Sequence, residues 1–288
     1  MFETILVPVD GSDSAKRAAA VGREFAEQYN ARLDMLHVLE DQSRLPGSES
    51  DQTSEEKGRE ILDKHADLVT GSNIEIDTRL VDGQPHEAIT EHATETASDL
   101  IVMGRHGQSG LRERLLGTVT DRVLRHTSIP VLVVPGEVSD HTTGNAYENV
   151  LITTDGSENA EQAAPYGEDI VQQFKATLHL LTVVDVQAAA GAFDAGGVSE
   201  DFTERLEDDG HEAIERLARQ IEDTDLPLES AVLRGDAQEV IVDYTVENDI
   251  GLIVMASEGE SNLASQSLGS VTDRVLRTVD IPVLVVFR

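Results

Sequence analysis

The sequence predicts an α/β protein made of two tandem domains, and three observations support this prediction. Residues 117–134 read GTVTDRVLRHTSIPVLVV and residues 269–286 read GSVTDRVLRTVDIPVLVV, so the chain repeats itself after 152 positions. The openings also match, with ILVPVDGSDSA at 5–15 and VLITTDGSENA at 150–160. Within each repeat, short β-rich runs alternate with longer helical patterns, which is typical of a parallel sheet covered by helices.

This alternation predicts nine elements in the first repeat, five of them strands. Strand cores such as ILV, LIVM and VLVV are continuously apolar, as expected when helices cover both faces of a sheet. The predicted order is strand 4–9, helix 13–29, strand 32–39, helix 55–69, strand 74–81, helix 85–96, strand 100–103, helix 118–126 and strand 130–134. We expect the second repeat to copy this plan. Residues 41–54 and 187–198 follow strand two in their repeats and are predicted to be flexible loops.

Length and composition set the domain boundaries. A chain of 288 residues suits roughly two domains of ~150 residues, and the repeat places them at 1–138 and 147–288, with 135–147 as the linker. No run of 18 apolar residues occurs and the N-terminus resembles no signal peptide, so we expect a cytoplasmic protein without a membrane span. The absence of cysteine excludes disulfides, thiolate catalysis and cysteine-based zinc sites.

The charge balance is strongly acidic, with 55 Asp and Glu against 22 Lys and Arg and a net charge of −33. A polyacidic surface repels the phosphate backbone, so nucleic acid is not an expected partner. Because the acids are spread along the whole chain, we interpret them as a halophilic adaptation, a solvated surface suited to high cytoplasmic salt. The nine histidines show no HxxxH pair or ligand-spaced cluster, so we predict no metal site.

A glycine-rich loop follows the apolar run LIVM in the first repeat. From Gly104 to Thr118 it reads GRHGQSGLRERLLGT, which is G-x2-G-x9-G-T. Glycine lets backbone amides approach a ligand closely, and a helix that begins at Thr118 offers free amides to phosphate. The carboxyl ends of parallel strands are where open α/β sheets bind ligands. We therefore predict a phosphate cradle, with a glycine-rich surface turn as the alternative.

An aspartate follows the first strand of each repeat, Asp10 in VPVDGS and Asp155 in TTDGS. A carboxylate there can accept hydrogen bonds from the sugar or base of a nucleotide, while Val38 at the end of strand two offers backbone groups to the base edge. The alternative is that Asp10 only caps the following helix or forms a turn with Gly11.

With these motifs in place, both repeats resemble the universal stress protein family, over nearly all 288 residues. The resemblance implies two Rossmann-like, adenine nucleotide alpha hydrolase-like domains, each with a five-stranded parallel sheet of order 3-2-1-4-5. It also implies that strand five mediates dimerisation and that the glycine loop holds ATP. The nucleotide-binding residues implied for the first domain are Pro8, Val9, Asp10, Val38, Met103, Gly104, Arg105, Gly107, Gly117, Thr118 and Val119.

The second repeat departs from this pattern. Its loop reads ASEGESNLASQSLGS, so Ala256 replaces the first glycine and Glu258 and Glu260 enter, while Arg105, His106, Arg112 and Arg114 have no basic counterparts. Carboxylates that face a polyphosphate lower its affinity, whereas arginines form charge-assisted bonds. The imbalance extends to the whole halves, with 26 acids and 14 bases in 1–144 and 29 acids and 8 bases in 145–288. The corresponding second-domain candidates are Asp155, Val183, Gly259, Gly269 and Ser270.

We therefore predict a stress-response or regulatory module that binds ATP in its first domain and binds it weakly or not at all in its second. A slow ATP hydrolase is one alternative, with His106 as the only candidate base and no catalytic residue assigned; a nucleotide-free interaction protein is the other. The implied cofactor is ATP. The sequence does not decide whether Mg accompanies it or whether AMP binds in its place. The apolar edges IPVLVV are expected to pair within the chain as a pseudo-dimer, and a homodimer is left open.

Overall fold

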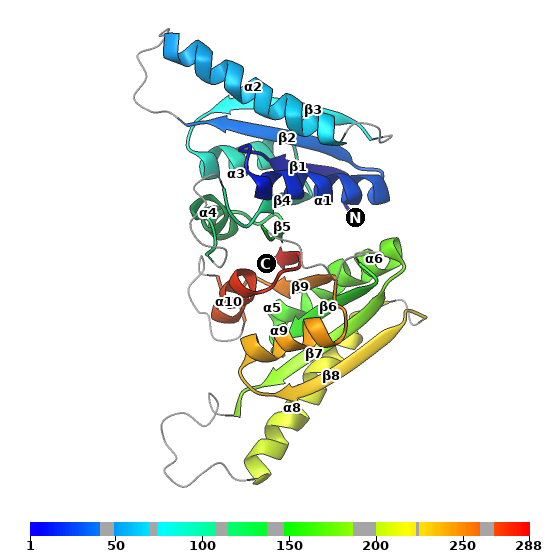
Figure 1. The fold of residues 1–288 in the computed structure, drawn as a ribbon. Coiled ribbons are helices and arrows are strands. Elements are labelled where there is room, and N and C mark those ends of the chain that lie inside the picture. The colour runs from blue at the N-terminus through cyan, green and yellow to red at the C-terminus, as the bar shows by residue number, and fades with distance from the viewer. Residues whose placement is uncertain are drawn as a thin grey trace, which may run out of the picture. The chain divides into compact units, whose positions relative to one another are not determined.

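The chain forms two compact units, Met1–Val138 and Ser139–Arg288, and each is described by itself (Figure 1). The structure is a computed structural model that describes residues 1–40, 49–69, 74–107, 115–136, 147–186, 200–222, 225–259 and 268–288. Each unit alternates strands and helices around a parallel sheet, so the predicted α/β fold with two domains is confirmed. No helix within the described ranges is long and apolar enough to cross a bilayer.

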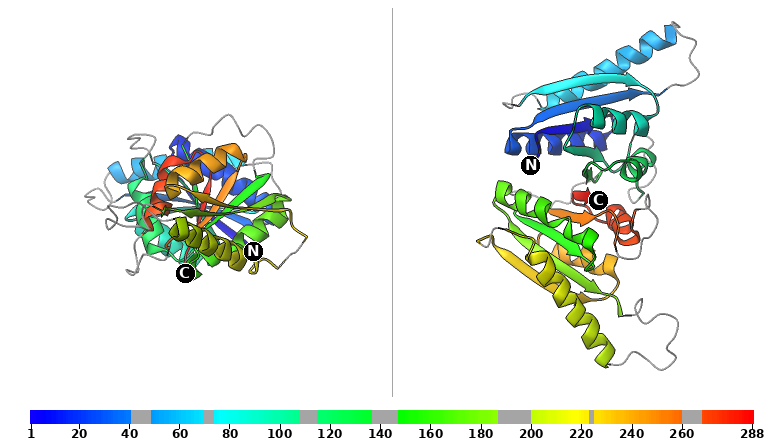
Figure 2. Two further views of the ribbon diagram at one scale, coloured as in Figure 1. Left: turned by 90° about the horizontal axis from the view of Figure 1, so that it is seen from below. Right: turned by 180° about the vertical axis from the view of Figure 1, so that it is seen from behind.

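The first unit is a five-stranded parallel sheet with helices on both faces. Its hydrogen-bonded strands follow the order β3-β2-β1-β4-β5. Helices α1 and α2 pack against each other, as do α3 and α4, and the two pairs cover opposite faces (Figures 1 and 2). The bounds are β1 Thr4–Pro8, α1 Asp13–Tyr29, β2 Arg32–Leu39, α2 Glu49–Val69, β3 Ile76–Asp82, α3 Pro85–Glu95, β4 Leu100–Gly104, α4 Thr118–His126 and β5 Val131–Val134.

The second unit has the same sheet plan, with strand order β8-β7-β6-β9-β10. The register of its first two strands also matches, because Thr4 pairs with Arg32 and Asn149 pairs with Thr177, 28 residues apart in both cases. The bounds are β6 Asn149–Thr154, α5 Glu158–Glu161, α6 Ala164–Phe174, β7 Thr177–Val184, α8 Glu200–Ala218, β8 Leu228–Arg234, α9 Ala237–Glu247, β9 Leu252–Ala256, α10 Ser270–Thr278 and β10 Val283–Val286.

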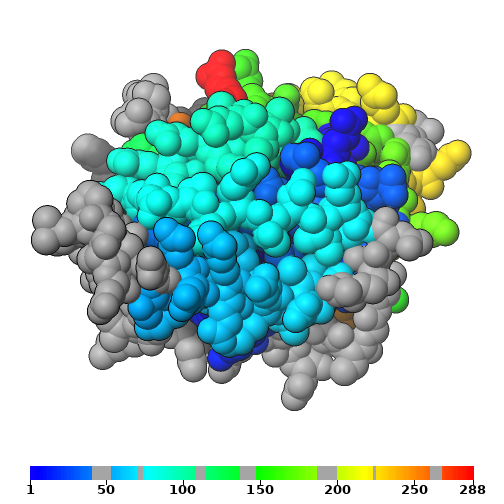
Figure 3. All heavy atoms as spheres, turned by 90° about the horizontal axis from the view of Figure 1, so that it is seen from above, coloured from blue at the N-terminus to red at the C-terminus, as the bar shows by residue number. Residues whose placement is uncertain are grey.

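Burial follows the position of each strand in its sheet. The central strand β1 carries Ile5, Leu6 and Val7 with no exposed surface, which is why its core is continuously apolar. The edge strand β3 instead exposes the consecutive residues 77–79, and its side chains lie on the surface beside those of α2 (Figure 3). The carboxyl ends of the central strands are thus held by a rigid core, and the candidate residues lie there.

One predicted loop is wrong in part. Residues 41–54 were expected to be irregular, but α2 already begins at Glu49. The run that follows Gly47 contains no further proline or glycine until Gly58, and its Glu and Gln residues favour a helix. Residues 41–48, the second predicted loop at 187–198 and residues 137–146 of the predicted linker lie outside the described residues.

The second unit does not copy the first helix of the plan. The single helix α1 corresponds to two helices, α5 and α6, which are interrupted between Glu161 and Ala164. Pro165 occupies the position of Ala20 and lies in the first turn of α6. Because proline has no N–H and its ring clashes with the carbonyl four residues earlier, it ends a helix in front of it and starts a new one.

A buried polar pair links the second strand to the third helix of each sheet, with different chemistry in each unit. In the first unit, Asp34 on β2 lies 2.8 Å from Nε2 of His92 on α3. In the second, the corresponding pair is His179 on β7 and Tyr244 on α9, with Nδ1 and Oη 3.1 Å apart. Burial lowers the pKa of His179, against the opposing effect of Glu229, and raises the pKa of Tyr244. The second pair is therefore neutral at pH 7.

This neutral pair predicts an acid-dependent loss of stability. Unfolded His179 takes up a proton near its ordinary pKa of about 6.5, whereas folded His179 resists protonation. The unfolded state then binds more protons, so the free energy of unfolding falls as the pH drops below about 6.5. We expect the His179→Gln variant to lose less stability than the native chain between pH 7.5 and 5.5, measured by denaturant unfolding at constant salt.

The variant Val246→Leu provides the control, because Val246 on α9 is 67% exposed and the exchange changes no ionisable group, so it should keep the native pH slope. Equal slopes for the native chain and His179→Gln would contradict the prediction.

Candidate functional site

The predicted residues of the first domain gather at the carboxyl edge of its sheet. Pro8 is the last residue of β1 and Val38 is the second-to-last residue of β2. Met103 and Gly104 are the last two residues of β4. Val9 and Asp10 follow β1, Arg105 and Gly107 follow β4, Gly117 is the N-cap of α4, and Thr118 and Val119 are its first residues. All eleven lie within the described residues, whereas Arg112 and Arg114 do not.

Asp10 joins the loop after β1 to the loop after β4. Its Oδ1 accepts a hydrogen bond from the backbone N–H of Ser12 at 2.9 Å, inside a turn in which Gly11 has a φ of 84°. Its Oδ2 lies so close to Gly107 that a Cβ on that glycine would be 2.6 Å away. The turn that we weighed as an alternative therefore exists, and it directs the other carboxylate oxygen towards the glycine loop.

Two further hydrogen bonds fix the start of the helix that follows the loop. The N–H of Gly117 donates to the carbonyl of Arg105 at 2.8 Å, and Thr120 Oγ1 donates to the carbonyl of Gly104 at 2.9 Å. The second unit repeats both bonds, from Gly269 to Ser257 at 2.7 Å and from Thr272 to Ala256 at 2.9 Å. Sequence reasoning missed these threonines, although the repeated GTVT and GSVT carried the signal.

Basic side chains lie beside the loop of the first unit. A Cβ on Gly136, just after β5, would be 3.7 Å from His106 Nδ1 and 3.9 Å from Arg17 Nη2. Among the described residues, Nε of Arg17 and Nε2 of His106 are buried without a hydrogen-bond partner. Arg105 is only 4% exposed. Arg17 lies on α1, far from the loop in sequence, which is why the motif did not indicate it.

The ionisation of His106 is set by this environment. Burial lowers the pKa of His106, the charge of Arg105 lowers it further, and a backbone contact with Leu115 acts in the opposite direction. The imidazole is therefore neutral at pH 7, and an anionic group placed beside it would favour its protonated form. In the part of the chain that the structure describes, no three His, Asp or Glu side chains are grouped to hold a metal ion.

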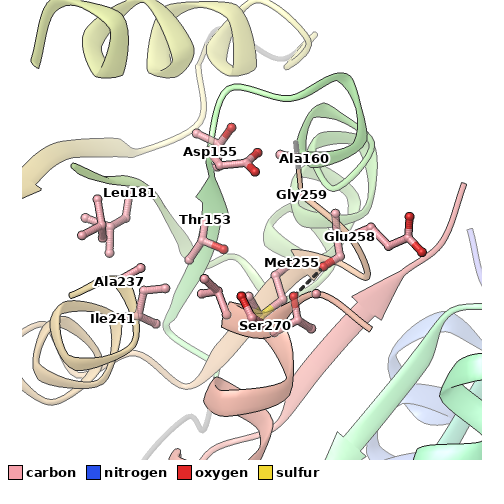
Figure 4. A pocket seen from close by; sticks show the side chains of 16 residues that line it. Thr153, Asp155, Ala160, Leu181, Ala237, Ile241, Met255, Glu258, Gly259 and Ser270 are labelled. Atoms are coloured by element: carbon pink, nitrogen blue, oxygen red, sulfur yellow. Dashed lines mark hydrogen bonds between the residues drawn. The ribbon is translucent and has the colours of Figure 1, made fainter. Parts of the chain in front are cut away.

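The second unit contains a cavity of about 130 Å³ at the corresponding edge of its sheet (Figure 4). Leu181, Ile241 and Met255 form part of its apolar wall, and Asp155 lies at its opposite side. The five residues predicted for the second domain all line this cavity: Asp155, Val183, Gly259, Gly269 and Ser270. The structure thus brings together every second-domain candidate, in the domain whose loop departs from the pattern.

A position-by-position comparison shows where the two units differ. Ten of the sixteen residues that line the second cavity are identical to their first-unit counterparts. Among the other six, only Glu258 for His106 introduces a carboxylate, and in Figure 4 its carboxylate points outwards from the cavity. Outside the lining, Arg105 corresponds to Ser257 and Arg17 to Gln162. The apolar end is therefore retained, and three basic positions are lost.

The exchange of Gly104 for Ala256 affects the packing of the first helix. A Cβ on Gly104 would lie 2.4 Å from Ser14 Oγ and 2.9 Å from the carbonyl carbon of the same residue. Such distances require the backbone of α1 to move. In the second unit the methyl group of Ala256 is present, and the helix that faces it is the short α5 rather than the start of a continuous helix.

The fold defines the class of the protein as a tandem Rossmann-like α/β protein, whose candidate site lies at the carboxyl ends of the strands, where open α/β sheets bind ligands. The sequence model of the universal stress protein family matches the chain twice, at residues 1–135 and 146–286. The chain therefore belongs to the universal stress protein family, with two family domains in tandem.

Individual relatives agree with this assignment. Universal stress protein MJ0531 of Methanocaldococcus jannaschii is 33% identical over 142 residues, covering 49% of this chain and 83% of that protein. Universal stress protein Mb2028c of Mycobacterium bovis is 26% identical over 295 residues and covers 98% of this chain and 96% of its own length. A crystal structure of a universal stress protein from Archaeoglobus fulgidus has the same fold, with a TM-score of 0.70 and 22% identity over 99% of this chain and 96% of that one.

The packing of Gly104 gives a direct test of the first site's architecture. We expect Gly104→Ala to lower the free energy of unfolding by about 1–3 kcal/mol, because overpacking a close backbone contact forces a shift. Gly136→Ala is the control, since its Cβ would meet only atoms at 3.7 and 3.9 Å. Urea unfolding at constant salt measures both, and equal stability of the two variants would contradict the steric argument.

Proposed function

We propose that the first domain, residues 1–138, binds ATP and that the chain acts as a stress-response or regulatory nucleotide-binding module. The observation that carries the proposal is the cluster of basic side chains beside the glycine loop, formed by Arg17, Arg105 and His106, whose counterparts in the second domain, residues 147–288, are not basic. The residues of the first domain fit both the nucleoside end and the phosphate end of a nucleotide.

At the nucleoside end, polar and apolar groups lie side by side. Asp10 is half-buried and has one oxygen directed at the glycine loop, so it can accept hydrogen bonds from ribose hydroxyls. Leu36 and Ile89 are the first-unit counterparts of the apolar wall of the second cavity, and Val38 is the counterpart of Val183. A flat base would bury apolar surface against this wall at roughly 25 cal/mol per Å².

At the phosphate end, the chain offers backbone amides and positive charge. The helix α4 begins at the exposed Thr118, and its first amides have no partner within the helix. Gly107 has no side chain that could cover its backbone amide, and the nearby Asp10 carboxylate leaves no room for one. Arg17 and His106 carry buried nitrogens without hydrogen-bond partners, and charge-assisted bonds to phosphate are about twice as strong as neutral ones.

The second domain lacks these charges. Gln162, Ser257 and Glu258 stand where the first domain has Arg17, Arg105 and His106, and the sequence from 256 to 270 contains no Lys, Arg or His. We propose that ATP binds there weakly or not at all. Pairing of the two strand-five edges, a homodimer and adaptation to high salt stay predictions from the sequence, as does the idea that a partner reads the ATP-bound state.

We expect isothermal titration at high salt to give one ATP site per chain, and His106→Glu to weaken it at least tenfold, which is about 1.4 kcal/mol. The reason is that the exchange places in the first domain the charge that the second domain carries. The matched variant Glu258→Gln removes a charge of the second loop and should leave the first site unchanged. Two equal ATP sites in the native chain would contradict the proposal.

Further measurements on the same samples separate the other readings. Titration with AMP shows whether the outer phosphates contribute, since a charge-based site should bind AMP more weakly than ATP. Single-turnover measurement of ADP formation in the native chain and in His106→Ala tests for slow hydrolysis. ADP formation that depends on His106 would favour a slow ATP hydrolase over a binding module.

A further inference from the structure

The cavity of the second unit has the same apolar residues as the first unit at one end and different charges beside its glycine loop. Leu181, Ile241 and Met255 are identical to their first-unit counterparts, as is Asp155. Leu181 has no exposed surface and Ile241 has 2%, so the wall is rigidly held by the core. The second domain therefore lacks the basic residues of the first glycine loop but has the same apolar wall, which would enclose a ring.

The polar groups of this cavity suit hydrogen-bond donors rather than anions. Asp155 is exposed, its Oδ1 accepts the N–H of Ser157 at 3.0 Å, and its Oδ2 lies against Gly259. Ser270 is also exposed at the start of α10. None of the described lining residues is a cation, and residues 260–267, ESNLASQS, contain no basic residue. Asp155 can therefore accept hydroxyl groups, and no described side chain that lines the cavity can pair with a phosphate. The nearby Arg216 donates to the carbonyl of Gly156 at 2.7 Å and is paired with Glu161.

The size of the cavity agrees with a ligand that buries one ring system. Its volume is about 130 Å³, whereas pockets that enclose drug-sized ligands measure roughly 300–1,000 Å³. An apolar protein cavity of about 150 Å³ holds a benzene molecule. The enclosed part of the ligand is therefore about the size of a ring, and the remainder extends past Asp155 and Ser270 towards solvent.

We propose that the second domain binds an uncharged nucleoside and discriminates against its phosphorylated forms. The ring lies against the apolar wall, the ribose hydroxyls donate to Asp155, and the negative charges of Asp155 and Glu258 disfavour a phosphate. The choice of a nucleoside rests on the proposed function, because the retained wall is shared with the proposed ATP site. The discrimination itself rests on the charges of the second domain alone.

Adenosine and AMP are the two probes, titrated into the full chain carrying Asp10→Ala so that the first domain contributes little. We expect one adenosine site per chain that binds AMP at least tenfold more weakly at low salt, where charge repulsion is least screened. Ala237→Leu should weaken adenosine binding at least tenfold, because Ala237 lines the cavity at the first residue of α9. Val246→Leu, on the same helix and 67% exposed, is the matched control.

A second variant keeps the test independent of folding. Glu258→His installs the first-domain residue, and we expect it to raise the AMP affinity of the second domain at least fivefold without changing its adenosine affinity. Equal affinities for adenosine and AMP in the Asp10→Ala chain would overturn the proposal. An adenosine affinity that Ala237→Leu leaves unchanged would also overturn it. Failure of the ATP site would instead appear in the His106→Glu comparison, which leaves the second cavity intact.

Discussion

The candidate sites depend on the close approach of two loops at the carboxyl edge of each sheet. In both units an aspartate after the first strand places one carboxylate oxygen against the second glycine of the loop after the fourth strand, Gly107 or Gly259. No side chain fits between them. The third glycine then donates its N–H back to the start of the loop. These contacts are made by backbone and by short side chains, so they persist in the second unit although the residues around them have changed.

Electrostatics separates the two units once this shared geometry is in place. The exchange of His106 for Glu258 reverses the sign of the charge that the position can carry, and Arg17 and Arg105 become uncharged residues. At the apolar end, by contrast, Leu36 and Leu181 are the same residue in the same place. Because apolar burial and charge pairing contribute separately to affinity, a domain can lose the second and keep the first. The duplication thus gives one chain two related candidate sites that carry different charges.

The sequence predicted the architecture well because its signals are local. Short segments were enough to place the elements in a parallel sheet. These segments are the apolar strand cores, the repeated GTVT and GSVT, and the aspartate after strand one. Arg17 was missed because it reaches the loop from α1, and only the folded chain brings it beside His106. The early start of α2 at Glu49 was missed because polar helix formers and loop residues have similar composition. The second-domain cavity follows from the summed shape of several elements, which no single motif describes.

The broken first helix of the second unit shows how one backbone contact can spread through a domain. In the first unit, Gly104 allows Ser14 on α1 to pack directly against the end of β4. Ala256 removes that space, and Pro165 prevents a continuous helix at the same time. A short α5 followed by α6 satisfies both constraints, with α5 in contact with β9 and α6 packed on β6. Ala256 therefore places a methyl group beside the loop backbone, and Gln162, the counterpart of Arg17, caps the end of the short α5. Since both differences lie at the end of the site where we propose that the phosphates bind, and the apolar wall is unchanged, steric and electrostatic effects support the same proposal.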